Sequence, residues 1–193
     1  MNLRKNRIRL AFLVFAIASL ACGLPISSNN QSPTAIPVSI DKAKSLETQL
    51  NQALTQAAQT GVLSFEVTEE QLTSAMSLYL QEEQSSVDLP LKNIQVRLRD
   101  GKIYLSASTQ QGFFKLPVEL VAGIEAVSCK IKFNIESASA GPIPIPKEQL
   151  NTLVPQAEQA LYEQITSSVG GNVCISSIII QDGKLSVSGQ KTP

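Results

Sequence analysis

The chain has 193 residues, with 16 lysine and arginine side chains against 16 aspartate and glutamate side chains, and it contains no histidine. Four of the basic residues lie within the first 21 positions, so the rest of the chain is mildly acidic, at about −4. This charge argues against a nucleic-acid partner, which would require a basic patch. The lack of histidine removes the commonest general base and a common metal ligand, and it excludes the usual zinc, serine–histidine and cysteine–histidine chemistries. We therefore expect no enzyme, no metal and no cofactor.

The N-terminus has the three parts of a secretory signal peptide. A positively charged start, from Arg4 to Arg9, precedes an apolar stretch over 10–18, and small residues lead into Cys22. The apolar stretch is roughly half as long as a membrane-spanning helix requires. The ending Ala-Ser-Leu-Ala-Cys resembles the bacterial lipobox, with serine where leucine is usual. By that resemblance, residues 1–21 are a lipoprotein signal peptide and Cys22 receives the lipid. The alternatives are an uncleaved signal anchor and an ordinary secretory signal.

Residues 22–40 are predicted to form the lipidated cysteine and a disordered tether. Pro25, Pro33 and Pro37 alternate with Ser, Asn and Gln, and they leave too few apolar residues to offset the entropy of ordering. The remaining chain, 41–193, suits one domain with a full core. We expect an extracytoplasmic protein of the bacterial cell envelope, held at the membrane by the lipid on Cys22.

Two helices are expected at the start of the domain. Apolar residues spaced by three and four over 41–59 indicate the first helix, and Gly61 is placed to end it. A short strand over 62–67 follows. Thr68 and Gln71 then have the spacing of a capping box and predict a second helix that ends near residue 84.

Two β-hairpins are predicted at Asp-Gly pairs, because a type I′ turn needs positive φ at both of its central residues. A turn at Asp100–Gly101 places Leu98 opposite Ile103. The second turn, at Asp182–Gly183, gives an inward-facing set of residues: Cys174, Ile178, Ile180, Leu185 and Val187.

Between the hairpins we expect more strands and one more helix. Residues 113–127 are predicted to be extended, with an edge position, bulge or bend near Pro117 and Ala122–Gly123. Residues 129–135 alternate as a half-buried strand. A proline-rich connection then leads into a helix over 147–167, which Pro155 should kink or restart.

The order of helix followed by Asp-Gly-Lys hairpin occurs twice, and Glu-Gln-Leu opens both helices, at Glu70 and Glu148. This order predicts an internal helix–hairpin duplication, with convergence as the alternative. Together the elements predict an α+β fold. In this fold a strongly twisted antiparallel sheet, made of hairpins and a long bent strand, packs around long amphipathic helices.

Cys129 and Cys174 are the thiols that remain once Cys22 is lipidated. The alternation of side chains along each predicted strand places both cysteines on its apolar face. Export would bring them into a compartment where disulfides form. We expect a disulfide between them, with two separately buried thiols as the alternative.

The sequence also resembles a protein family. The helix start T-E-E-Q-L, hairpins of the form V-x-L-x-D-G-K-I-x-L-S and the proline-led I-P-x-P segment are similar to those of LmeA-like bacterial phospholipid-binding proteins. That family is similar to the tubular lipid-binding (TULIP) superfamily. The likeness covers about 64–189, and the alanine-rich helix at 41–59 and the scarcity of aromatic residues depart from it. The resemblance implies an apolar groove for acyl chains between helix and sheet, and it implies no catalytic residues.

Nine apolar residues are the candidates to line such a groove: Leu72, Met76, Leu80, Ile94, Val96, Leu98, Ile131, Phe133 and Ile135. The alternative is that they form an ordinary closed core, which the pattern alone does not distinguish from a groove. A charged patch of Arg97, Arg99 and Lys102 beside Tyr104 suits either a lipid phosphate or a solvated face. The leading hypothesis is a tethered module that binds a phospholipid or another apolar ligand. The rival hypothesis is a structural or adaptor lipoprotein with a closed core and a protein partner.

Overall fold

The computed structural model describes residues 34–82, 91–111 and 114–192. The predicted signal peptide, Cys22 and most of the predicted tether therefore lie outside the described residues. From Ala35 onward the chain forms one compact unit, so this unit includes the end of the predicted tether. No helix in the described part of the chain combines the length and the apolar character needed to cross a bilayer.

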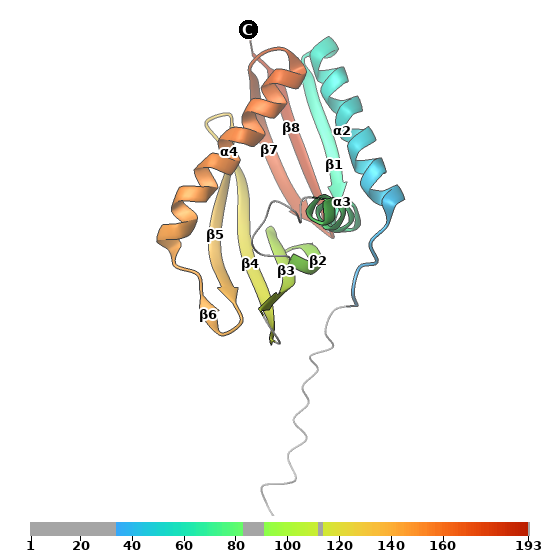
Figure 1. The fold of residues 1–193 in the computed structure, drawn as a ribbon. Coiled ribbons are helices and arrows are strands. Elements are labelled where there is room, and N and C mark those ends of the chain that lie inside the picture. Colours follow the sequence, from blue (N-terminus) through green and yellow to red (C-terminus); the bar gives the residue numbers. More distant parts are fainter. Residues whose placement is uncertain (1–33, 83–90, 112–113, 193) are drawn as a thin grey trace, which may run out of the picture. The chain divides into compact units, whose positions relative to one another are not determined.

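The described residues form an α+β fold with three helices and two antiparallel sheets (Figure 1). The helices are α2 (Ile40–Thr60), α3 (Glu69–Glu82) and α4 (Lys147–Val169). The three-stranded sheet has the order β1-β8-β7, with β1 (Val62–Thr68), β7 (Val173–Gln181) and β8 (Lys184–Lys191). The five-stranded sheet has the order β2-β3-β4-β5-β6, with β2 (Leu91–Arg99), β3 (Lys102–Gln111), β4 (Phe114–Val127), β5 (Lys130–Ala140) and β6 (Ile143–Pro144).

The helix ends follow the local sequence signals. The Ser39 side chain accepts a hydrogen bond from Lys42 N–H at the start of α2, and Gly61 ends the helix with φ 78°. The predicted capping box at α3 is confirmed, because Gln71 N–H donates to Thr68 Oγ1 at 3.2 Å and Thr68 N–H donates to Gln71 Oε1 at 2.9 Å. These bonds satisfy N–H groups that have no partner inside the helix.

Of the two effects predicted for Pro155, a kink or a restart, the restart does not occur, because α4 runs without interruption from Lys147 to Val169. Proline removes the hydrogen bond to the carbonyl four residues earlier, which is that of Asn151. Both Pro155 and Asn151 are exposed, so water can solvate the carbonyl that loses its partner.

Both predicted hairpin turns are confirmed. Positive φ values occur at Asp100 and Gly101 and again at Asp182 and Gly183, and Leu98 pairs with Ile103 as expected. The predicted irregularity near Ala122 is a register shift between β4 and β5.

Two expectations for the cysteine strands are wrong. The register of β7 shifts between Ile175 and Ser177, and this β-bulge inverts the alternation before it. The residue buried at this end of β7 is therefore Ile175, at 2% exposure, rather than Cys174. Cys129 lies in the turn between β4 and β5, where Ser128 and Cys129 both have positive φ. It is exposed and is not part of the strand's apolar face.

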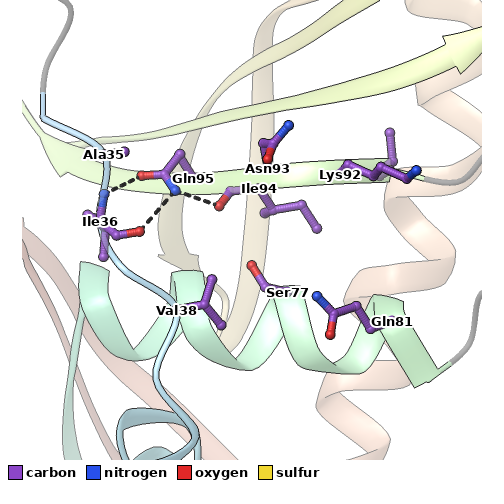
Figure 2. A pocket seen from close by; sticks show the side chains of 10 residues that line it. Ala35, Ile36, Val38, Ser77, Gln81, Lys92, Asn93, Ile94 and Gln95 are labelled. Atoms are coloured by element: carbon purple, nitrogen blue, oxygen red, sulfur yellow. Dashed lines mark hydrogen bonds between the residues drawn. The ribbon is translucent and has the colours of Figure 1, made fainter. Parts of the chain in front are cut away.

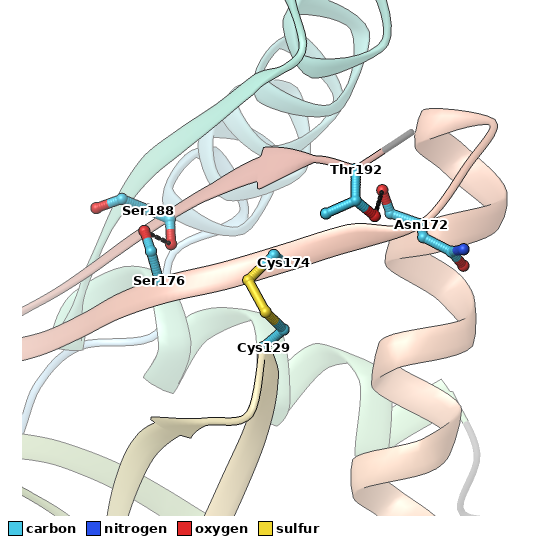
Figure 3. Close-up of a disulfide and its surroundings, with 6 residues drawn as sticks. All are labelled: Cys129, Asn172, Cys174, Ser176, Ser188 and Thr192. Atoms are coloured by element: carbon cyan, nitrogen blue, oxygen red, sulfur yellow. Dashed lines mark hydrogen bonds between the residues drawn. A yellow bond between two sulfur atoms is a disulfide. The ribbon is translucent and has the colours of Figure 1, made fainter.

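The predicted disulfide between Cys129 and Cys174 is present, and it joins the two sheets (Figure 3). Beside it, Ile175 N–H donates to the Cys129 carbonyl at 3.1 Å. At the other end of β7, Gly183 N–H donates to the Leu98 carbonyl at 3.1 Å. The strands expected to form one sheet are thus divided into two sheets, which the disulfide and these hydrogen bonds connect.

The core is one cluster drawn from α2, α4 and both sheets. Its buried members are Ala53, Leu54, Ala57, Leu63, Val96, Leu98, Ile131, Ile165, Val169, Val173, Ile175, Leu185 and Val187. The alanines of α2 let this helix approach its neighbours closely, and α2 contacts α3, β1 and α4.

Glu158 is a buried carboxylate that ties α4 to β5. It accepts hydrogen bonds from Lys132 Nζ at 2.5 Å and from Phe133 N–H at 2.8 Å. Burial raises the pKa of the Glu158 carboxyl, but these two hydrogen bonds and the charge of Lys132 outweigh burial, so the pKa lies below its ordinary value. A lowered pKa means that the carboxylate stabilises the fold above its unfolded-state pKa, and that this contribution disappears as the pH falls through the folded-state pKa.

We predict that Glu158→Gln lowers the free energy of unfolding at pH 7 by about 1–3 kcal/mol, because a charged hydrogen-bond acceptor is lost. The difference from the wild type should begin to shrink as the pH falls below the ordinary value of 4.5, and it should be lost as the pH falls through the lower pKa of the folded state, where the wild-type carboxyl also becomes neutral. Urea denaturation at pH 7 and pH 3 measures both effects. Glu163→Gln, on an exposed residue of the same helix, is the control and should change stability little. A difference that does not depend on pH would contradict the prediction.

Candidate functional site

Helix α3 supplies hydrogen bonds to the outer edge of β2, which is an edge strand of the five-stranded sheet. Glu69 Oε2 accepts from Leu98 N–H at 3.2 Å. One helical turn later, Thr73 Oγ1 accepts from Val96 N–H at 2.9 Å and donates to the Val96 carbonyl at 3.3 Å. Four residues of helix and two residues of strand both advance by about 6 Å, so side chains spaced by four match alternate strand residues. The α3 side chains thus replace part of a missing neighbouring strand.

Ser77 is the next residue in this row of α3. Figure 2 shows its side chain pointing from the helix toward β2 at Ile94. Ser77 is 6% exposed, and within the described part of the chain its buried Oγ has no hydrogen-bond partner. The register of β2 shifts between Lys92 and Gln95, where Asn93 has φ 53°. The regular match between helix and strand therefore ends at Ser77.

A pocket of about 770 Å³ lies where this match ends. Such a volume falls within the range of about 300–1,000 Å³ that is typical of small-molecule sites. It is lined by Ala35, Ile36, Val38, Ser77, Gln81, Leu91, Lys92, Asn93, Ile94 and Gln95. Val38 and Ile94 are both lining residues, and Figure 2 shows the Ile94 side chain pointing from β2 toward α3, so the surface of the pocket there is apolar.

The extended segment Ala35–Val38 forms one wall of the pocket, and Gln95 holds it there. Gln95 Oε1 accepts from Ile36 N–H at 2.7 Å, and Gln95 Nε2 donates to the Ile36 carbonyl at 3.1 Å (Figure 2). The Ile36 side chain is buried. One residue after Val38, Ser39 N–H donates to Ser74 Oγ at 3.1 Å. The last residues before α2 are thus bound to β2 and α3.

The charge of the pocket is set by Lys92, because the other described residues that line it are uncharged. Lys92 is exposed, so its ammonium group remains solvated. A site with one exposed cation and no carboxylate suits a neutral or singly anionic ligand better than a cationic one.

The nine predicted groove residues do not lie together in this pocket. Ile94 lines it. Val96, Leu98 and Ile131 are buried in the core cluster, whereas Leu72, Met76 and Phe133 are partly buried and pack against it. Leu80 and Ile135 are half-buried.

The predicted charged patch on the first hairpin is largely paired within the protein. Arg97 Nη1 lies 3.1 Å from Glu69 Oε1, and both side chains are mostly buried. Lys102 Nζ lies 2.7 Å from Glu136 Oε2. Both cations are thus engaged by carboxylates, which compete with any phosphate for them.

Two further hollows lie along α2, and most of their lining residues are glutamine, asparagine or threonine. Within the described ranges, no group of three or more His, Cys, Asp and Glu side chains could hold a metal ion. The pocket between α3 and β2 is therefore the best candidate for binding an apolar molecule.

Sequence reasoning missed most of this pocket. Ala35–Val38 has the composition of a tether, and Gln95 lies on the face of β2 that alternation assigns to solvent. The signal that was available is the row Glu69, Thr73 and Ser77, which gives α3 a polar stripe beside its apolar one. Such a stripe predicts a solvated face unless the helix is known to lie along a strand edge.

Comparison with known proteins leaves the site to be interpreted from its own geometry: the chain matches no family model, no curated protein and no solved structure.

We predict that Gln95→Ala releases Ala35–Val38 from the pocket wall, because both main-chain groups of Ile36 lose their partner. Hydrogen exchange at the Ile36 amide should accelerate, and the free energy of unfolding should fall by about 1–2 kcal/mol. Hydrogen exchange read by mass spectrometry, together with urea denaturation, measures the change. Gln181→Ala, on an exposed residue of β7, should alter neither. Unchanged hydrogen exchange at Ile36 in Gln95→Ala would show that the two hydrogen bonds between Gln95 and Ile36 do not hold the segment.

Proposed function

We propose that this protein is an exported lipoprotein, tethered to the membrane through Cys22, whose folded unit binds an acyl lipid or a similar apolar ligand. The observation that carries the proposal is the pocket of about 770 Å³ between α3 and β2. Ile36, Val38, Leu91 and Ile94 give it apolar surface, and its size suits a small ligand. The proposal assigns the protein no catalytic role and no nucleic-acid partner.

The place of the pocket along the chain supports this role. Its wall begins at Ala35, and the chain from Cys22 to Ala35 can span at most roughly 45 Å when fully extended. A lipid on Cys22 would thus keep the pocket within that distance of the membrane, on the extracytoplasmic side of the cell envelope. Ligand capture from a bilayer requires such proximity.

The sequence resemblance to LmeA-like and TULIP proteins supports the same function. Our proposal also includes the finer architecture that this resemblance implies, in which a strongly twisted sheet wraps long amphipathic helices. In this proposal the ligand lies at the edge of the helix–sheet interface rather than along its whole length, because Val96, Leu98 and Ile131 belong to the core.

A second candidate function is a structural or adaptor lipoprotein, and the closed core favours it. An adaptor needs no internal site, and its surface must meet a protein partner. Ile143 and Leu153 are 67% and 61% exposed and supply apolar surface for such a contact.

The full chain with Cys22→Ser tests the proposal, because it removes the lipidation site without altering the folded unit. We predict that the wild type fractionates with membranes, whereas Cys22→Ser is released to the soluble fraction. Lipid extraction and native mass spectrometry of the soluble variant, purified without detergent, should then show one bound acyl lipid per chain.

A variant that blocks the pocket distinguishes lipid bound in the pocket from lipid bound elsewhere on the protein. Val38 lines the pocket, so Val38→Trp in the Cys22→Ser chain would occupy part of it. This variant should abolish the co-purifying lipid while leaving the urea midpoint close to that of the parent. Val62→Trp, an exposed strand residue outside the pocket, is the matched control. If no lipid is bound in the parent chain, the adaptor function is favoured instead.

A further inference from the structure

The unpaired Ser77 hydroxyl identifies a polar position inside an otherwise apolar part of the pocket. Thr73, one turn earlier on α3, uses its hydroxyl as both donor and acceptor toward Val96. Ser77 is similarly buried, yet its Oγ has no partner among the described residues. Buried hydroxyl groups in native proteins nearly always have a hydrogen-bond partner. Because Ser77 is a lining residue of the pocket, its unpaired hydroxyl points to a partner that enters from the pocket.

The surroundings of Ser77 define the chemistry of that partner. Ile94 lies beside Ser77 in Figure 2, and Val38 lines the same pocket, so the part of the ligand next to the polar group is apolar. Ser77 Oγ–H can donate one hydrogen bond, which suits an oxygen acceptor. Lys92 is the charged residue among the described residues of the lining, and its charge favours a neutral or negative ligand group over a positive one.

We propose that Ser77 Oγ donates a hydrogen bond to the carbonyl oxygen of an acyl group, carboxylate or ester, whose chain lies against Ile94 and Val38. This inference rests on the proposed function and specifies the part of the lipid that the pocket recognises. The hydroxyl and the apolar side chains would together recognise the part of a lipid where its polar head joins the alkyl chain. Lys92 distinguishes the two sources of the carbonyl, because its charge attracts a carboxylate and not an ester.

The test is competition for a fluorescent acyl probe bound to the full chain with Cys22→Ser. The competitors are decanoate, methyl decanoate and decane, which share a chain length and differ in their oxygen atoms. We expect decanoate and methyl decanoate to bind about tenfold more tightly than decane, the effect of one buried hydrogen bond. Ser77→Ala should weaken both oxygen-containing ligands about tenfold and leave decane unchanged. Lys92→Gln should weaken decanoate alone if the carbonyl is that of a free acid.

Thr109 Oγ1, which is also buried and lacks a hydrogen-bond partner among the described residues, supplies the matched control. Thr109 does not line the pocket, so Thr109→Val should leave all three affinities unchanged. Ser77→Ala should keep or raise the urea midpoint, because it removes an unpaired buried group, so a loss of affinity would not reflect unfolding. Equal affinities in Ser77→Ala and the parent would overturn the Ser77 contact while leaving the proposed function in place. A parent chain that binds neither the probe nor decane would overturn both.

Discussion

The exposed edges of the five-stranded sheet impose the constraint on which the rest of the structure depends. An edge strand leaves alternate N–H and C=O groups without a strand partner, and burying them unpaired is costly. On β2, Glu69 accepts from Leu98 N–H and pairs with Arg97. At the other side of the sheet, the two-residue β6 pairs with β5 only at Ser139 and Ala140, so most of β5 is an open edge as well. There Glu158 accepts from Phe133 N–H and pairs with Lys132. The same device thus serves both edges: a helix carboxylate binds one strand N–H and the cation of the preceding residue.

This device fixes α3 and α4 against the sheet and also sets the limits of the pocket. At its start, α3 is tied to the other sheet as well, because Glu69 N–H donates to the Gly183 carbonyl at 2.9 Å while Gly183 N–H donates to Leu98. From that fixed point the match between helix and strand extends through Thr73. It ends at Ser77, where the β2 bulge moves the strand out of register. The pocket is therefore a consequence of how α3 covers β2, and the segment that leads to the tether closes one side of it.

Local chemistry made several parts of the fold predictable. Thr68 and Gln71 marked a helix start, and Asp100 and Asp182 marked turns, because each signal lies within a few residues of its effect. The bulge at Ser176 was not predictable, since one extra residue in β7 inverts the alternation that sequence reasoning assumes. The pair of hydrogen bonds between Gln95 and Ile36 was also missed, because the two residues are 59 positions apart and neither carries a local sequence signal. The predicted disulfide was found, although a turn rather than a strand presents Cys129.

The central claim, that α3 side chains complete the edge of β2, is tested most directly by hydrogen exchange at single amides, followed by NMR in the wild type and in Thr73→Val. The account predicts that the Val96 and Leu98 amides are both protected in the wild type. In Thr73→Val the Val96 amide should exchange much faster, while the Leu98 amide, held by Glu69, remains protected. A Val96 amide that is unprotected in the wild type, or whose exchange is unaffected by the substitution, would contradict the account.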